Sequence, residues 1–166
     1  MFFWLSLFSD AYQFPAAVKE RVGKQYPHLS DDQLSLVMEG LRQYFKLLGR
    51  ANNETVSMPS RAVDVAWHEF ILFTQAYKEF CQQGIGRFIY HTPVEEMTSP
   101  AELEKGMKKA WFLACELHGI NHLSPTKLPL LFAIDGALNI PNRVGYNFFS
   151  SIAGSTDGGG GGGDGG

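Results

Sequence analysis

The sequence predicts an all-α protein: a single irregular bundle of about five or six helices with a disordered glycine-rich C-terminal tail. Three observations lead to this prediction. Apolar residues recur at helical spacing in several segments, most of which have a serine before them and a glycine after them. No stretch alternates apolar and polar residues as a half-buried strand would. From Gly154 onward the chain is mostly glycine, which cannot bury apolar surface.

Length and composition fit one globular domain, which we expect to span residues 1–153, followed by the tail at 154–166. Of the 166 residues, 45% are apolar and 19% are charged, which is ordinary for a protein with one core. The formal net charge is -3 and the Lys and Arg residues are scattered. Both facts argue against a nucleic-acid partner, since binding to nucleic acid calls for a basic face.

The cysteines and the N-terminus bear on the compartment. Cys81 and Cys115 fall in apparent amphipathic helices and are interpreted as small buried hydrophobes, which suits a reducing compartment. The apolar start, residues 1–8, has no basic residue before it and no clear cleavage site after it, and it is too short to span a bilayer. We expect it to pack on the domain, with a weak membrane-surface anchor as the alternative. The sequence therefore predicts a cytoplasmic protein without a membrane span.

Two helices are expected in the first third of the chain. The first follows Pro15 and ends near Gln25, because Pro27 disfavours helix in the residue before it. The second begins at Ser30, where Ser-Asp-Asp-Gln forms a capping box with two acids in the first turn, and it should end at Gly49. Its apolar residues form one continuous stripe: Leu34, Val37, Met38, Leu41, Tyr44, Phe45 and Leu48. A stripe of this kind is typical of core.

The central helix is expected from about residue 59 to residue 82 or 83, with Gly84 after its end. Ser60 and its neighbours supply candidate caps, and Pro59 suits an early helical position. Apolar residues go almost all the way round this helix, which predicts a place at the centre of the bundle rather than on its surface. Asp64 and His68 lie four residues apart, so their side chains are neighbours on one face.

The later part of the chain should contain at least two more elements. A glycine turn at residues 84–86 leads into a short extended or single-turn segment. Residues 99–102, Ser-Pro-Ala-Glu, combine an N-cap, a proline at the first helical position and a capping box. An apolar block at 128–138 forms the next element. Residues 139–151 should return across the surface.

The best candidate site consists of Asp64 and His68 together with His91, which follows the glycine turn. In one interpretation, Asp64 accepts a hydrogen bond from His68 and the pair is structural. In the other, the three side chains are metal ligands for a divalent transition metal such as zinc or iron, or Asp64 orients His68 as a general base. Two ligands do not hold a transition metal, so His91 as a third ligand decides between these interpretations.

Other candidate residues surround this site. Trp67 is a core or binding residue whose indole N–H needs a partner. Glu69 and Tyr77 are the nearest acid/base candidates. The string Cys115, His118 and His122 looks like half of a zinc site, but a second pair of ligands is missing and a glycine should end the helix between the two histidines.

The segment from Val63 to Leu72, followed by Tyr77, Phe80-Cys81 and His91-Thr92-Pro93, resembles the glycine-rich domain-containing protein family. The shared features are a D-x-x-W-H core on a helix, an aromatic residue followed by Phe-Cys, a later His-Pro-type turn and a glycine-rich tail. Here no cysteine interrupts the tail glycines, unlike in many relatives. The resemblance supports Asp64, Trp67, His68 and His91 as positions of interest, and it assigns no reaction, because that family is itself largely uncharacterised.

Two functions follow from the sequence. The first, which it narrowly favours, is a non-enzymatic binding or scaffold module with an unknown protein partner. The second is a small metal-dependent enzyme, a hydrolase or an oxidoreductase, with Asp64, His68 and His91 as ligands. The feature that separates them is whether His91 meets the other two side chains at a pocket.

Overall fold

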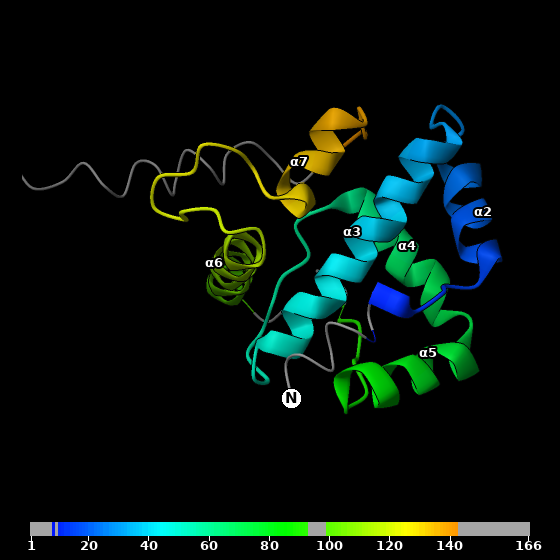
Figure 1. The fold of residues 1–166 in the computed structure, drawn as a ribbon, viewed down its shortest axis with the longest axis horizontal. Helices are drawn as coiled ribbons and strands as arrows, with labels where there is room; N and C mark the ends of the chain where they lie inside the picture. The colour runs from blue at the N-terminus through cyan, green and yellow to red at the C-terminus, as the bar shows by residue number, and fades with distance from the viewer. Residues whose placement is uncertain (1–7, 9, 93–98, 143–166) are drawn as a thin grey trace, which may run out of the picture.

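The computed structural model describes residues 8, 10–92 and 99–142, and throughout this part of the chain the regular elements are helices (Figure 1). The elements are α2 (Ala16–Gln25), α3 (Asp31–Arg50), α4 (Arg61–Ile71), α5 (Thr74–Phe80), the π-helix η1 (Cys81–Ile85), α6 (Pro100–Leu117) and α7 (Leu130–Ala137). The prediction of an irregular all-α bundle is confirmed. The expectations for residues 1–7 and for the glycine tail lie outside the described residues.

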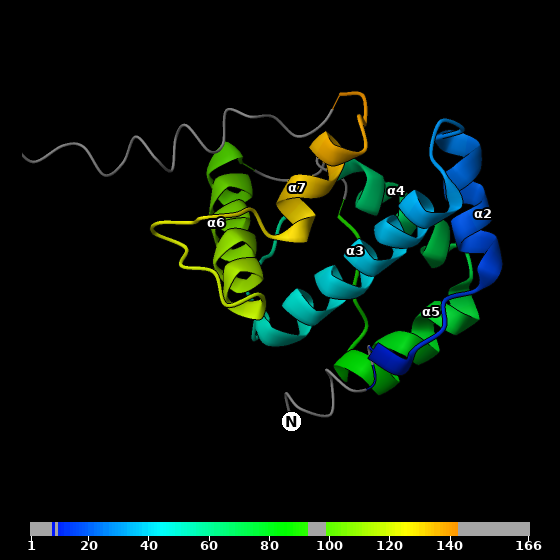
Figure 2. The same ribbon diagram turned by 45° about the horizontal axis from the view of Figure 1, so that its top comes forward.

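Helices α3 and α4 form the middle of the bundle. Helix α3 contacts α2, α4, α6, α7 and η1, and α4 contacts α2, α3, α5 and α7. Figures 1 and 2 show α2 and α6 at opposite ends of the long α3, with α5 crossing beyond its lower side. None of the helices within the described ranges is long and apolar enough to cross a membrane.

Helix α3 forms as its sequence predicts. The Ser30 side chain accepts a hydrogen bond from the Gln33 N–H, and the Gln33 side chain accepts one from the Ser30 N–H, which completes the capping box. The helix continues one residue beyond Gly49. The aromatic members of its stripe reach the centre of the core, where the Phe45 and Phe80 rings lie 4.7 Å apart.

The single helix predicted for residues 59–83 is wrong, because the chain bends between α4 and α5. Phe73 leaves helical geometry with φ -84° and ψ 64°, and its N–H donates to the Phe70 carbonyl in a tight turn. The bend allows Phe70 and Phe80 to enter one aromatic core together with Tyr77, with ring centroids 5.3 Å apart for Phe70 and Tyr77 and 5.6 Å for Phe70 and Phe80. Leu72 at the bend stays 64% exposed.

The first turn of α4 is capped by residues from two places in the chain. Ser60 caps locally, since its Oγ accepts from the Val63 N–H at 3.1 Å. Asp135 on α7 accepts from the backbone N–H of Arg61 at 2.7 Å, from that of Ala62 at 3.2 Å and from the Ser60 hydroxyl at 2.7 Å. Asp135 and Ser60 are both buried, so these partners replace water at the positive end of the helix.

We predict that Asp135→Asn lowers the free energy of unfolding by about 1–3 kcal/mol, because the amide places an N–H₂ group against donors that now face a carboxylate oxygen. Urea unfolding followed by circular dichroism measures this change. Glu20→Gln, the same kind of change on the exposed face of α2, should cost less than about 0.5 kcal/mol. Equal costs for the two variants would show that the Asp135 carboxylate does not stabilise α4.

Gly40 permits the close approach of α3 and α4. A Cβ atom at this position would lie 2.7 Å from Val63 Cγ2 and 3.6 Å from Ile134 Cδ1. Val63 is fully buried and β-branched, so its methyl group has little room to move. Gly40 therefore allows a spacing between α3 and α4 that a larger residue would disturb.

Gly40→Ala should destabilise the protein by about 1–3 kcal/mol through overpacking, in spite of alanine's higher helix propensity. The same substitution in a Val63→Ala background should cost far less, because the clashing methyl group is gone. A double-mutant cycle by urea unfolding measures the coupling. Additive effects would contradict the proposed contact.

Candidate functional site

Asp64, His68 and His91 come together at the outer side of α4. Asp64 lies in the first turn of α4 and His68 one turn later, while His91 comes from the extended segment after η1. His91 Nε2 lies 2.9 Å from Asp64 Oδ1 and 2.9 Å from His68 Nε2, and His68 Nε2 lies 3.8 Å from Asp64 Oδ2. Within the described ranges, this is the group of His, Cys, Asp and Glu side chains whose ligand atoms are close enough to share an ion.

Hydrogen bonds alone satisfy this arrangement poorly. His91 Nε2 carries at most one proton, and it has the Asp64 carboxylate and the His68 Nε2 beside it at the same distance. A metal ion bound by all three side chains would accept one lone pair from each of them. Ligand atoms of a tetrahedral site with bonds of about 2.1 Å lie about 3.4 Å apart, so an ion would need His91 Nε2 to move about 0.5 Å away from its two neighbours, which now lie 2.9 Å from it.

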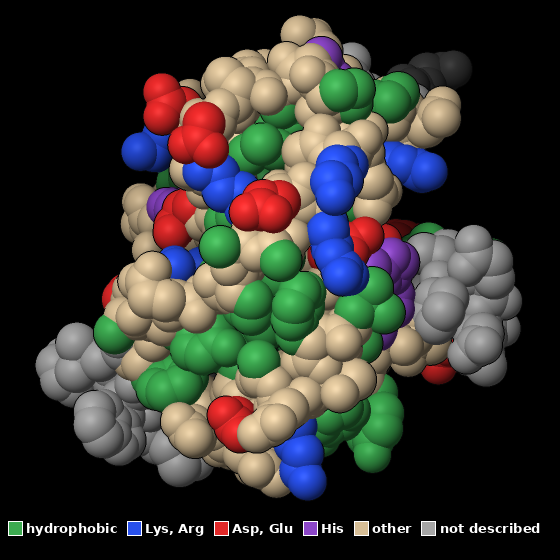
Figure 3. Space-filling model, turned by 90° about the vertical axis from the view of Figure 1, so that its right-hand side faces the viewer, with side chains coloured by type: hydrophobic (Ala, Val, Ile, Leu, Met, Phe, Trp, Pro, Cys, Tyr) green, Lys and Arg blue, Asp and Glu red, His purple; other side chains and the backbone are tan. Residues whose placement is uncertain are grey.

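The site is buried on one side and open on the other. The His91 ring packs edge-on against Trp67, with centroids 4.4 Å apart, and only 13% of the His91 side chain is exposed. The His68 side chain is 52% exposed. Figure 3 shows histidine side chains beside acidic and basic ones at the edge of the face that it draws.

A cavity of about 720 Å³ adjoins the three side chains. Its wall is formed by Tyr44 and Leu48 of α3, the loop before α4, α4 itself, the segment 87–92 and Leu103 of α6. Asp64, His68 and His91 all line it, together with Trp67. A ligand in this cavity can therefore reach the three polar atoms directly.

Comparison with known proteins gives a family but no activity. A family model described as UCP032817-like matches residues 6–161, which is nearly the whole chain. The chain belongs to the UCP032817-like family. Neither a curated protein nor a solved structure matches it. The family is uncharacterised, so the chemistry of this UCP032817-like protein has to come from its site.

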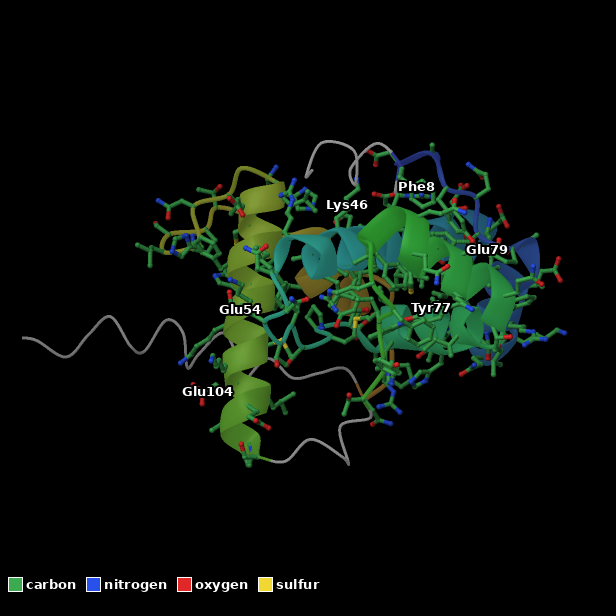
Figure 4. The ribbon with its side chains drawn as sticks, turned by 90° about the horizontal axis from the view of Figure 1, so that it is seen from below. Phe8, Lys46, Glu54, Tyr77, Glu79 and Glu104 are labelled. Atoms are coloured by element: carbon green, nitrogen blue, oxygen red, sulfur yellow. The ribbon has the colours of Figure 1, made fainter. Side chains whose placement is uncertain are left out.

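A chain of buried hydrogen bonds holds the segment that carries His91. The Tyr77 hydroxyl donates to the Ile89 carbonyl at 2.6 Å and accepts from Trp67 Nε1 at 3.1 Å, which gives the indole N–H its partner. Tyr77, labelled in Figure 4, is 1% exposed, and burial raises its pKa above the ordinary value, so the hydroxyl stays protonated. The chain reaches this segment through Gly86, whose φ of +82° suits glycine.

Tyr77→Phe should lower the free energy of unfolding of this UCP032817-like protein by about 1–3 kcal/mol, because the variant leaves the Trp67 N–H and the Ile89 carbonyl buried without a partner. Thermal and urea unfolding measure the loss. Tyr90→Phe is the matched control, since Tyr90 is 80% exposed and should change stability by less than about 0.5 kcal/mol. A Tyr77→Phe variant as stable as the control would show that the Tyr77 hydrogen bonds do not hold the segment that carries His91.

Glu69 and Tyr77, the two acid/base candidates, do not face the cavity of this UCP032817-like protein. Glu69 turns toward α2, where Oε1 accepts from Gln25 Nε2 at 2.9 Å and Oε2 lies 3.4 Å from Arg21 Nη1. Tyr77 lies in the core, as described above. Trp67 is buried in the core and also contributes to the cavity wall.

The second cluster suggested by the sequence, Cys115, His118 and His122, does not assemble. The Cys115 thiol is buried among apolar side chains. His118 Nε2 lies 2.9 Å from Gln43 Oε1, and burial lowers the pKa of His118 below its ordinary value. The His122 ring packs against Phe112. Cys115 and Cys81 are free, buried thiols, as their helical positions predict.

Sequence reasoning missed three residues at or beside the site: Arg61 and Arg87, which line the cavity, and Asp135, which caps α4. Arg61 had a readable signal, because it precedes Asp64 by three residues and His68 by seven and so shares their helical face. Arg87 and Asp135 had none. Their roles arise from the meeting of segments that are distant in the chain.

Proposed function

We propose that Asp64, His68 and His91 bind one divalent transition metal ion, zinc or iron, and that the protein is a small metal-dependent enzyme acting on a ligand in the adjoining cavity. The observation that carries this proposal is the position of His91 Nε2, 2.9 Å from both of the other ligand atoms. Such convergence of two imidazoles and a carboxylate is the donor set of many catalytic metal sites.

Three protein ligands leave coordination positions for water or substrate. Zinc held by Asp64, His68 and His91 would supply a water activated near neutral pH, which is the chemistry of a hydrolase. With iron, two histidines and one carboxylate suit oxygen chemistry. The identity of the metal therefore separates a hydrolase from an oxidoreductase.

The proposal gives Glu69 and Tyr77 positioning roles in place of the acid/base roles that the sequence suggests. The hydrogen bonds of Tyr77 to Trp67 and Ile89 support a role in fixing His91. The contacts of Glu69 with α2 support a role in fixing the end of α4 that carries His68. Trp67 fixes His91 by packing against its ring.

A second candidate is the binding or scaffold module with an unknown protein partner. Phe88 and Tyr90 favour it, because they are 41% and 80% exposed and their rings pack edge to face at the cavity wall. For either candidate we propose a cytoplasmic protein, which the two free thiols support, without a nucleic-acid partner. Kinship with glycine-rich domain-containing proteins remains part of the proposal, supported by the D-x-x-W-H core and the tail.

We predict that elemental analysis of the purified, tag-free protein finds close to one transition metal ion per chain. His68→Ala and His91→Ala should lose it, because two ligands hold a transition metal poorly. The drop in affinity should exceed the roughly 10–100-fold that the loss of an outer-shell hydrogen bond costs. Cobalt substitution followed by visible absorption gives the coordination number of the site.

His122→Ala is the matched control, since this histidine packs against Phe112 and does not line the cavity. It should retain the metal. A wild-type protein that holds no metal after growth in supplemented medium and after titration, with both site variants merely less stable, would make the three side chains structural. The binding module would then be the better proposal.

A further inference from the structure

Two arginines, Arg61 and Arg87, line the same cavity as the three candidate metal ligands. In the described parts of the chain, neither guanidinium forms an ion pair with a carboxylate. A guanidinium group in a cavity wall presents several N–H donors in a planar fork that matches carboxylate and phosphate oxygens. The cavity therefore has donors for an anion.

Arg61 shares the helical face of the candidate metal ligands. It lies three residues before Asp64 and seven before His68, so successive turns of α4 place a cation, a carboxylate and an imidazole along the cavity. Its guanidinium lies near the Tyr26 hydroxyl, where its charge opposes the rise that burial gives to the pKa of Tyr26. Arg61 is exposed to solvent, so N–H groups of its guanidinium are accessible to a ligand.

Arg87 lines the same cavity from a different segment, at the start of the stretch that carries His91. Its Nη2 lies 3.4 Å from the Leu48 carbonyl near the end of α3, a long contact that orients the side chain and leaves donors unused. Phe88 and Tyr90 follow it in the cavity wall, with ring centroids 4.9 Å apart. This wall therefore offers a cation beside an exposed aromatic surface.

The carboxylates of the cavity wall contact residues other than these two arginines. The lining contains two, Glu54 and Asp64. Glu54 lies beside α6 (Figure 4), where its Oε1 is 2.7 Å from Lys109 Nζ, and this lysine lowers the pKa of the Glu54 carboxyl. Asp64 is engaged by His91 at 2.9 Å. Among the described residues neither carboxylate pairs with Arg61 or Arg87, so both guanidinium groups keep N–H donors for a ligand.

We propose that the cavity binds a small organic oxyanion, a carboxylate or a phosphate ester with an apolar body. Arg61 and Arg87 hold the anionic group, and Phe88 and Tyr90 pack against the body. The inference rests on the proposed function in one respect: a metal ion bound by Asp64, His68 and His91 would face the same ligand. The contacts of the ligand with Arg61 and Arg87 do not require the metal.

Titration calorimetry of the full-length protein tests this with three probes that share one ring: benzoate, phenyl phosphate and benzyl alcohol. One of the two anions should bind at least about tenfold more tightly than the neutral alcohol, as expected for charged hydrogen bonds. Which anion binds more tightly separates a carboxylate site from a phosphate site. Arg61→Gln and Arg87→Gln should each reduce the preference, and added salt should weaken it.

Lys24→Gln is the matched control, because it removes one positive charge from the exposed face of α2, outside the cavity, and should leave the preference intact. The preference should also persist in His68→Ala, which lacks a proposed metal ligand and keeps both arginines. If the protein binds no metal, the preference for an anionic probe should therefore still be observed. Equal binding of all three probes, no binding, or a preference unchanged in both folded arginine variants would overturn the inference.

Discussion

The first turn of helix α4 is largely buried, so the backbone N–H groups of its buried residues Ala62 and Val63 need partners within the protein. A buried helix end without partners is strongly disfavoured. Ser60 and the carboxylate of Asp135 provide those partners, and Asp135 alone accepts three hydrogen bonds. Because Asp64 and His68 follow within the next two turns, the cap that satisfies the helix also sets the position of two of the three site residues.

The third site residue is fixed by a separate set of contacts. His91 belongs to an extended segment, which by itself would hold a side chain less firmly than a helix does. Tyr77 binds the backbone of this segment, and Trp67 contacts both Tyr77 and the His91 ring. The three polar atoms are therefore held by well-packed, buried neighbours, which is what a preorganised site requires. This packing also explains why so many aromatic residues crowd around α4.

Local features of the structure could be predicted from sequence, whereas features made by distant contacts could not. The capping box at Ser30, the N-cap at Ser99 and the shared face of Asp64 and His68 depend on residues a few positions apart. The bend near Phe73 carries no proline or glycine, and only the packing of the aromatic core explains it. The cap from Asp135 likewise lacks a sequence signal, because nothing in the sequence distinguishes a buried aspartate from an exposed one.

The hydrogen bond between Ser60 and Asp135 joins residues that are 75 positions apart in the chain. During synthesis the ribosome delivers all three candidate ligands well before it delivers α7. A nascent chain that ends before α7 holds Asp64, His68 and His91 but has no carboxylate for the start of α4. Domains fold as units once their distant parts can meet, and closing a loop of this length has an entropic cost. We therefore expect completion of the site to depend on completion of the domain.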